Sequence, residues 1–541
     1  MYRSGFVGSG GVVGRAAGLR RIVCVRMVST SATTPKMAYA ELCDRLKEIS
    51  YLGGVAGLLG WDEQVMLPEG GMTARGKQKA ALAATLHDKR TDSKLGELIA
   101  TAESDVQALG LMEQANVRDA RIAYDRHTKL SRELAAREAE LGVEGFIAWK
   151  KAREESDFSI FAPVLQEIVD LRKEIASVTK PEWDAYDACI DLFERGMTSA
   201  RLTEIFDELK AGLVPLLNEI RGALEAQPEL PSGLKGSEDW DTKKQAELSR
   251  QIAEALGFDF QRGRLDVSVH PFTGGSDPAD VRITTRYSSD NPWEGIMGTV
   301  HEVGHAMYEQ GRNEEFSGLP VSSALSLGAH ESQSLFWERY VGQSLGFWEF
   351  ASKAVHEIFP HTSSIPAKEF YRGVNRVMPN CFIRVETDEV TYPLHVILRF
   401  ELEKGIMDGS IALEDVPRRW NDKFEEYLGV RPDSDANGVL QDVHWSGGAI
   451  GYFPTYTLGA IAGAQWFYAV KKEFPDLNEK MAKGEFSEVK KWLNENVHSV
   501  GSLHSSLDEL LESVTGEPLN VKYFLQYLND KYRAYYGLES D

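Results

Sequence analysis

The sequence predicts a mostly α fold that contains one small antiparallel β-sheet. Residues 38–230 show helical periodicity of apolar positions almost throughout. The convincing alternation of apolar and polar residues is confined to 264–270 and 281–285, which flank a turn-like stretch with Gly and Pro at 271–278. We therefore expect a helical body that contains two short antiparallel strands.

Composition is ordinary for a soluble globular protein. The 541 residues can form a large core or several domains, and the formal net charge of −22 argues against nonspecific binding to nucleic acid. The four cysteines show no CxxC spacing and are too few for a disulfide framework. This pattern fits a reducing or redox-neutral compartment.

The first 36 residues differ from the rest because they carry six basic residues and no acid. That composition is typical of an organelle transit peptide, directed to a mitochondrion or a plastid. A disordered basic tail, or an initiator at Met27 or Met37, is the alternative and would leave the protein in the cytoplasm. We expect residues 37–541 to form a single domain.

Two parts are expected within that domain. Residues 37–230 form a helical part, and a polar segment with Pro and Gly at 227–236 is the best internal boundary. Residues 260–541 follow as the second part. The predicted strands lie near the start of this second part.

The stretch after these strands is predicted to be a helix with both ends marked in the sequence. Asn291 suits the N-cap, Pro292 suits the first helical position, and Glu294 stands where it can close a capping box. Gly311 is a natural C-terminal stop. The helix therefore spans the residues between Pro292 and Gly311.

This helix carries the motif His301-Glu302-Val303-Gly304-His305. Residues four apart share one face of a helix, so both His301 and His305 can reach one metal ion. Glu302 stays close enough to take a proton from a metal-activated water, which is the minimal kit for peptide hydrolysis. A chance match on a charged surface helix is the alternative, and the helical context counts against it.

A catalytic zinc site has three protein ligands, and the third is expected on a second helix downstream. The candidate is Glu331, within a largely apolar helical stretch that continues through Tyr340. A Glu on such a helix is costly unless it is paired, hydrogen-bonded or metal-bound. A salt bridge to Arg339 is the alternative, but next to the HExxH motif ligation by Glu331 is the better hypothesis.

The stretch 443–470 has no Asp, Glu, Lys or Arg and is long enough to span a membrane. However, it contains Pro454 and several Gly, Thr and Tyr residues, so a transmembrane role is not expected. We interpret 446–454 as a loop and 457–470 as a buried helix beside the active site.

The chain from about residue 37 to its end resembles the M32 metallocarboxypeptidases of the carboxypeptidase Taq type. The resemblance rests on five ordered motifs: HEVGH at 301–305, HESQS at 330–334, DxRxT at 280–284, an IRxxxD-like block at 383–388, and GxxQDxHW at 438–445. The chain departs from the IRxxxD-like block at Thr387, where Ala is more usual.

The resemblance implies a helical fold with a deep active-site groove, similar to neurolysin and angiotensin-converting enzyme, in which residues 260–541 hold the metal site and the groove. It implies one Zn²⁺ per chain, although Co²⁺ can also activate members of the family. Zinc peptidases of this broad kind bind the substrate as an added strand along a sheet edge. It implies peptide substrates from which single C-terminal residues are removed with broad specificity, and it implies a homodimer. It also implies that Asp280 and Arg282 of DxRxT organise the sheet edge and limit the length of the groove. Neither a nucleic acid nor a membrane is expected as a partner.

A carboxypeptidase needs a cation that holds the terminal carboxylate of its substrate. Arg384 suits this role because its guanidinium binds a carboxylate with two parallel hydrogen bonds and because it lies in an otherwise apolar stretch. A buried structural pair between Arg384 and a Glu is the alternative. Arg282 is the competing anchor.

Donors for the developing oxyanion are expected in the uncharged stretch around and after Trp445. His444 and Tyr456 are the candidates, with Tyr452 as the competing tyrosine and ordinary core packing as the alternative for each. Asp388 or Asp442 is expected to accept a hydrogen bond from a ligand histidine.

The sequence therefore predicts a metal-dependent carboxypeptidase. An oligo-endopeptidase or dipeptidase on the same zinc site is the first alternative. A helical scaffold with a vestigial site is the second, and the intact ligands, base and flanking motifs count against it.

Overall fold

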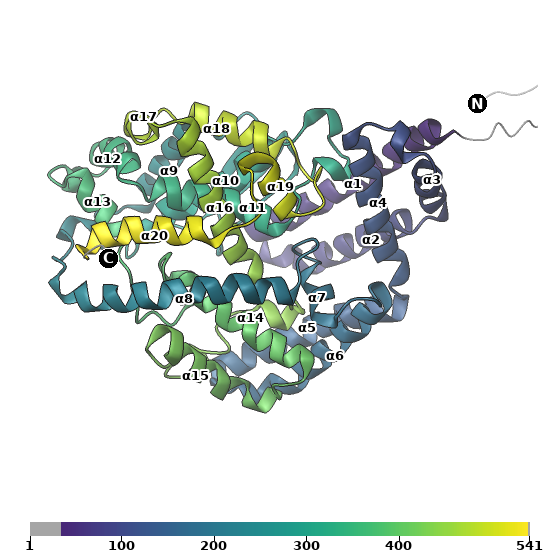
Figure 1. Ribbon diagram of the computed structural model, residues 1–541, viewed down its shortest axis with the longest axis horizontal. Helices are drawn as coiled ribbons and strands as arrows, with labels where there is room; N and C mark the ends of the chain where they lie inside the picture. Colours follow the sequence, from purple (N-terminus) through teal and green to yellow (C-terminus); the bar gives the residue numbers. More distant parts are fainter. Residues whose placement is uncertain (1–33, 539–541) are drawn as a thin grey trace, which may run out of the picture.

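The computed structural model describes residues 34–538, and these form a predominantly helical body with one small sheet (Figure 1). The prediction of a mostly α fold is confirmed. The predicted transit peptide at 1–36 lies outside the described residues except for its last three. Thr34 caps the first helix by accepting a hydrogen bond from the backbone N–H of Met37.

The helices before the sheet are α1 (Pro35–Val65), α2 (Met72–Arg90), α3 (Ser93–Glu103), α4 (Leu111–Lys129), α5 (Arg132–Glu155), α6 (Ala162–Thr179), α7 (Ala185–Ile190), α8 (Ser199–Ala223) and α9 (Thr242–Leu256). Those after it are α10 (Pro292–Gln310), α11 (Leu327–Leu335), α12 (Leu345–Ile358), α13 (Ala367–Val374), α14 (Tyr392–Asp408), α15 (Val416–Leu428), α16 (Pro454–Glu473), α17 (Leu477–Lys483), α18 (Ser487–Leu493), α19 (Leu507–Thr515) and α20 (Val521–Tyr536).

Local signals set many of these helix ends. Side chains of Ser, Thr, Asp or Asn accept hydrogen bonds from first-turn amides at the starts of α3, α5, α7, α8, α9, α11, α12, α19 and α20. Glycines in the left-handed region follow α9, α14, α15, α17, α19 and α20, where their lack of a Cβ permits that backbone conformation.

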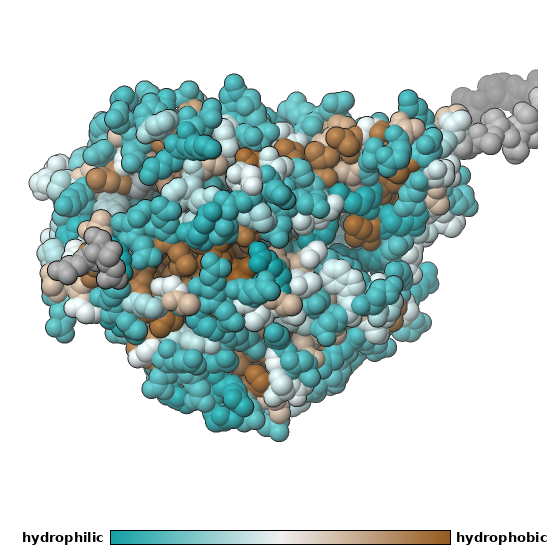
Figure 2. Space-filling view, viewed as in Figure 1, coloured by the Kyte–Doolittle hydropathy of each residue, from teal (hydrophilic) through white to brown (hydrophobic). Residues whose placement is uncertain are grey.

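One large hydrophobic core joins residues from Leu141 to Tyr536 and so includes both sides of the polar segment at 227–236. A second, smaller cluster lies between α1, α3 and α4. Figure 2 shows that the viewed surface is mainly hydrophilic, with hydrophobic residues gathered in the seam where α20 packs along α8. The long, densely packed core gives the elements around the site fixed positions.

The sheet has three strands in the order β1–β3–β2. Strands β1 (Gly263–Val267) and β3 (Asp280–Thr285) are parallel, and β2 (Thr273–Asp277) is antiparallel to β3. The small sheet and both predicted strands are present. The antiparallel pairing of these two strands is wrong, because the stretch interpreted as a turn supplies a third strand between them along the chain.

Helix α1 packs against β2 at very short range. A Cβ at Gly54 would lie 2.5 Å from the carbonyl oxygen of Ser276, and a Cβ at Gly57 would lie 2.5 Å from that of Gly275. Two glycines one helical turn apart therefore allow the helix to approach the strand backbone. This contact covers the far end of β2 and leaves Thr273 at the end nearest α10.

Helix α16 begins at Pro454, earlier than the predicted buried helix at 457–470, and runs to Glu473. It packs along α11, the helix that carries Glu331. Within residues 34–538, every helix is either too short or too polar to span a bilayer.

Candidate metal centre

Helix α10 presents the HExxH motif as its sequence predicts. Asn291 occupies the N-cap, Pro292 is the first helical residue, and the helix ends at Gln310 directly before Gly311. The expected capping box is absent, because the side chain of Asn291 makes no cap hydrogen bond and Glu294 instead forms an ion pair with Arg286. Both ends of α10 are therefore at the predicted residues. The backbone preferences of Pro292 and Gly311 explain these ends, and the predicted side-chain cap does not contribute.

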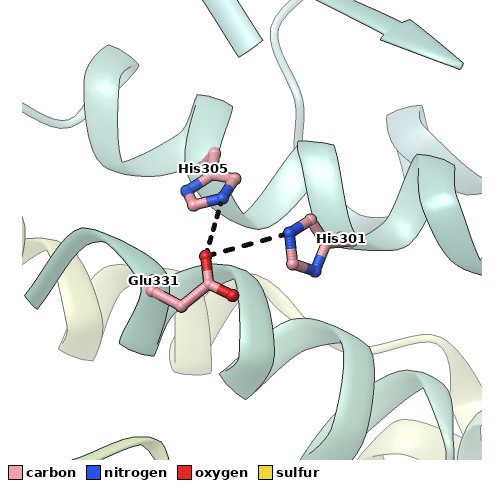
Figure 3. A group of neighbouring side chains, drawn as sticks. All are labelled: His301, His305 and Glu331. Carbon is pink, nitrogen blue, oxygen red and sulfur yellow. Dashed lines mark ion pairs between the residues drawn. The ribbon is translucent and has the colours of Figure 1, made fainter. Parts of the chain in front are cut away.

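His301, His305 and Glu331 converge on one point between α10 and α11 (Figure 3). Oε2 of Glu331 lies 3.3 Å from Nε2 of His305 and 4.0 Å from Nε2 of His301. Ligand atoms bound about 2.0–2.1 Å from one tetrahedral ion stand about 3.4 Å apart. The three side chains remain 13–24% exposed, so solvent and substrate can reach them.

The packing that brings Glu331 to the histidines depends on small residues. A Cβ at Gly304 would lie 2.6 Å from the carbonyl oxygen of Gln333, so α10 and α11 touch at this glycine inside the motif. On the other side of α11, a Cβ at Gly459 of α16 would lie 2.8 Å from Cβ of Glu331. Bulkier residues at these two positions would separate the helices and displace the third ligand.

The acceptor that orients His301 is Glu338, whose Oε2 lies 2.7 Å from Nδ1 of the imidazole. Glu338 lies in a π-helical segment, Phe336–Gly342, that continues α11. The expectation that Asp388 or Asp442 has this role is wrong. Asp388 accepts hydrogen bonds from backbone amides near the start of α14, and Asp442 pairs with arginines.

The imidazole of His305 is held through Nδ1, on the opposite side of the ring from the metal-facing Nε2, by a series of hydrogen-bonded side chains. Its Nδ1 lies 2.6 Å from Nδ1 of His330, and Nε2 of His330 lies 2.9 Å from Oε1 of Glu309. If His305 offers Nε2 to a metal, its Nδ1–H donates to His330, whose Nε2–H then donates to Glu309. Arg312 in turn donates to Glu309, so the chain ends on a paired carboxylate.

The electrostatics of the centre favour a bound cation. Burial opposes the charged form of His301, but Glu338 and Glu331 outweigh it and raise the pKa of His301 to about 10. Burial likewise opposes ionisation of Glu331, yet His305 and His301 lower its pKa to about 2. Burial and His330 lower the pKa of His305, so its imidazole is the neutral form that ligates a metal. A pocket that stabilises positive charge on His301 suits a divalent metal, so the residues present fit a zinc-type site.

Glu302 lies on the same helix and is 6% exposed. The hydroxyl of Thr273, the first residue of β2, donates to its Oε2 at 2.6 Å. The predicted general base is therefore next to the metal ligands and in contact with the sheet.

A group that we name the arginine cluster comprises Arg384, Arg399, Asp442 and Tyr392. Asp442 accepts from Arg384 at 2.8 Å and from Arg399 at 2.6 Å, and the phenol oxygen of Tyr392 accepts from Nη1 of Arg384 at 2.7 Å. Both guanidiniums are buried, and Asp442 is the acid within ion-pair distance of each. Arg384 thus has a buried acid as a structural partner, but that acid is Asp442 and not the Glu of the alternative interpretation.

His444 and Tyr456 lie beside the arginine cluster. Nε2 of His444 is 3.1 Å from the hydroxyl of Tyr456, whose ring centroid is 4.7 Å from the guanidinium of Arg384. Burial lowers the pKa of His444 to about 4, so its imidazole is neutral at ordinary pH. Tyr452 also approaches His444, with ring centroids 5.2 Å apart, so both candidate tyrosines remain near the site.

Arg282 lies on β3, the central strand, and so does not form the edge of the sheet. It donates to both oxygens of Asp280 at 2.9 and 3.0 Å and stacks 4.6 Å from the ring of Trp61 on α1. The DxRxT pair therefore links the sheet to α1, and the structure does not bring it together with Arg384.

Several neighbours of the site escaped sequence reasoning, namely Glu338, His330, Glu309, Thr273 and Tyr392. Glu338 follows Glu331 by seven residues, a spacing that puts both side chains on one face of a helix. This spacing could have identified Glu338 from the sequence. The other four residues make their site contacts with residues of other helices, strands or turns, so no spacing within one element predicts these contacts.

Comparison with known proteins gives a consistent result. Residues 41–532 match the family model described as carboxypeptidase Taq (M32) metallopeptidase. Thermostable carboxypeptidase 1 of Thermus thermophilus is 40% identical over 515 residues, which cover 93% of this chain and 100% of that protein. Carboxypeptidase 1 of Bacillus subtilis is 38% identical over 504 residues, which cover 92% of this chain and 98% of that protein.

Solved structures agree with the sequence comparison. The M32 carboxypeptidase from Deinococcus radiodurans R1 is 36% identical with a TM-score of 0.88, and the match covers 92% of this chain and 99% of that one. Trypanosoma cruzi metallocarboxypeptidase 1 is 38% identical with a TM-score of 0.88, covering 92% of this chain and 100% of that one. The resemblance predicted from the five motifs is confirmed.

Proposed function

The chain belongs to the carboxypeptidase Taq (M32) family of metallopeptidases, and on this basis we propose that it removes single C-terminal residues from peptides with broad specificity. That it is a metal-dependent carboxypeptidase follows from the family. The residue roles, the metal and the assembly given below are parts of the proposal.

His301, His305 and Glu331 would hold one Zn²⁺ ion, with Co²⁺ as the alternative metal. When bound, the ion supplies a Lewis acid that lowers the pKa of water and polarises the scissile carbonyl. Glu338 and His330 keep the two imidazoles in the tautomers that leave Nε2 available. The 3.3 and 4.0 Å separations of the ligand atoms support this assignment.

Glu302 acts as the general base. Its carboxylate takes a proton from water while the water oxygen forms a bond with the scissile carbonyl carbon. When the C–N bond breaks, Glu302 returns this proton to the leaving amine, so the carboxylate is regenerated. Position next to His301 and low exposure to bulk solvent support this role.

The oxyanion that develops on the scissile carbonyl would accept a hydrogen bond from Tyr456 or from His444. Burial and neighbouring phenols raise the pKa of Tyr456, so its hydroxyl remains a donor. His444 is neutral because its pKa is lowered to about 4, and it can therefore donate through one ring nitrogen only. Tyr452 is the competing donor.

The structural observation that supports cleavage at a C-terminus is the charge of the arginine cluster. Among the described residues, Arg384 and Arg399 form ion pairs with one shared carboxylate, Asp442, so the cluster retains one positive charge without an acid of its own in a buried position. An unpaired buried charge is costly, and the terminal carboxylate of a peptide would neutralise it. Tyr392 adds a hydroxyl that already accepts from Arg384 and can donate its own hydrogen to the same carboxylate.

Helix α16 joins this cluster to the metal ligands. Tyr456 near its start contacts Arg384, and Gly459 one turn later touches Glu331. A substrate whose scissile carbonyl faces the metal would therefore place its chain end near Arg384. Arg282 is the weaker anchor, because Asp280 already neutralises it.

Two further parts of the proposal concern the whole protein. By resemblance to its family the chain would form a homodimer. The basic segment at 1–36 would direct it to a mitochondrion or a plastid, with a cytoplasmic location as the alternative. Peptides are the expected partners.

Mass spectrometry of the products from one peptide, prepared as the free acid and as the C-terminal amide, tests the proposal. We expect stepwise loss of single residues from the free acid, much slower cleavage of the amide, and no cleavage after metal removal by a chelator. Internal fragments from both peptides would instead favour the oligo-endopeptidase alternative on the same site.

A further inference from the structure

The hydroxyl of Thr273 is the hydrogen-bond donor that the structure gives to the side chain of Glu302. Its Oγ1 lies 2.6 Å from Oε2 of the carboxylate and 3.2 Å from the backbone oxygen of the same residue. Thr273 lies at the start of an edge strand, 29 residues earlier in the chain, so helix α10 alone does not create this contact.

The start of β2 is itself held by Thr284, the last residue of the DxRxT motif. The backbone N–H of Phe272 donates to Oγ1 of Thr284 at 3.0 Å, and the Thr284 amide donates to the Phe272 carbonyl oxygen at 3.0 Å. Ser268 also donates to the Thr284 hydroxyl at 2.7 Å. Thr284 is fully buried, so the residue before Thr273 is fixed on both its amide and its carbonyl group.

A carboxylate attached to a helix by a flexible side chain can rotate away from its reacting position. A hydrogen bond to one oxygen fixes the plane of the carboxylate and leaves the other oxygen free to take a proton. Displacements of about 1 Å in such a group can cost roughly a hundredfold in rate.

We propose that Thr273 is the positioning residue of the general base, and that Thr284 of the DxRxT motif serves it by fixing the start of β2. This inference rests on the proposed role of Glu302. It assigns a function to the Thr of DxRxT that is separate from the Asp280–Arg282 pair, which instead contacts α1.

A purely structural role would need only the bond from Thr273 to the Glu302 backbone oxygen, which ties β2 to α10. The two roles differ in what they predict. Loss of a structural bond lowers stability, whereas loss of the carboxylate bond lowers kcat and leaves KM and metal content unchanged.

Three substitutions separate these roles. Thr273→Val removes the hydroxyl and keeps the shape, and we expect kcat to fall roughly ten- to a hundredfold with KM within about twofold. Thr273→Ser restores the donor and should recover most of the loss. Thr299→Val is the matched control, because the hydroxyl of this buried threonine of α10 donates to the backbone oxygen of Gly295 and not to Glu302. It should retain the kcat of the parent enzyme.

The second arm combines Thr273→Val with Glu302→Gln and measures the residual rate. If Thr273 acts through the carboxylate, its loss should cost little once Glu302 is replaced, so the two effects are strongly non-additive. Equal losses in both backgrounds, a parent-like kcat for Thr273→Val, or equally low kcat for the Val and Ser variants would overturn the inference. An active Glu302→Gln enzyme would instead refute the proposed function itself. If Thr273→Val does not fold, Thr273→Ala replaces it in the same scheme.

Discussion

The metal centre and the arginine cluster both contact the first turns of α16 and have opposite charge balance. In the metal centre, Glu331 and Glu338 face the ligand histidines and raise the pKa of His301 to about 10. In the arginine cluster, two guanidiniums share the single carboxylate of Asp442.

The difference shows how one peptide end can be recognised at two points. The first region has an excess of negative charge and suits a metal cation. The second has an excess of positive charge and suits a carboxylate anion. A substrate that binds to both regions needs an amide carbonyl for the metal and a free carboxylate for the arginine cluster. The last residue of a peptide has these two groups, one on each side.

Replacing Glu302 by Gln should have the largest effect, because it removes the base while it keeps the size of the side chain, the three metal ligands and the arginine cluster. We expect kcat to fall by roughly 10²–10⁴ while the metal remains bound. Steady-state kinetics together with metal analysis of the purified variant check this. Normal turnover would show that another group takes the proton.

Glu331→Ala tests whether Glu331 is a metal ligand in the negatively charged metal centre. Two histidines alone should hold the ion much more weakly, so metal analysis after dialysis should find the variant largely without metal. Glu309→Gln serves as the comparison, because it alters only the chain behind His305 and should lose far less metal. Full metal content in Glu331→Ala would point to a different third ligand.

Arg384→Ala tests the positive side. Loss of a hydrogen-bonded charge should reduce kcat/KM for a free-acid peptide roughly ten- to a hundredfold and should narrow its advantage over the amide. Arg384→Lys keeps the charge but cannot form two parallel hydrogen bonds with a carboxylate. Its kcat/KM for the free-acid peptide should therefore lie between those of the parent enzyme and Arg384→Ala. If Arg384→Ala has unchanged kinetics and Arg282→Ala has a lower kcat/KM for the free-acid peptide, Arg282 of β3 becomes the residue that binds the terminal carboxylate.

Glu338→Gln should have a smaller effect that is confined to the metal centre. It preserves size but weakens the acceptor for His301, and outer partners of this kind typically contribute about 10–100-fold in metal affinity. Competition with a chelator measures this affinity. If Glu338→Gln and the parent release metal at the same chelator concentration, the orienting role of Glu338 is wrong.

Glu403 gives the smallest predicted effect and concerns pH. This buried carboxylate accepts from Trp445 and Gly451 at both ends of the loop after His444, and burial raises its pKa to about 7. A folded-state pKa above the unfolded value gives stability that is complete below about pH 4.5 and is lost as pH rises through about 7.

The free energies of unfolding of the parent and Glu403→Gln check this. Between about pH 5 and about pH 8 the parent should lose about 2–3 kcal/mol more than the variant, because the amide does not titrate. Parallel pH dependences would show that Glu403 keeps an ordinary pKa in the folded protein.

Much of the metal centre was predictable because its geometry is local. Residues four apart share a helix face, so His301 and His305 were identifiable as a pair, and an acid on an apolar helix marked Glu331. The ends of α10 were predictable from Pro292 and Gly311. The parallel pairing of β1 with β3 was not, because strand direction depends on where an intervening segment lies in space.

The sequence by itself therefore determined the family, the mostly helical fold and the chemical types in the site, since these follow from short-range spacing and ordered motifs. Only the tertiary structure decided which acid orients each histidine, which carboxylate two arginines share, and which hydroxyl holds Glu302. These partners belong to helices and strands far apart in the chain. Packing at contacts such as Gly304 and Gly459 brings them within hydrogen-bonding distance, and no local periodicity records that packing.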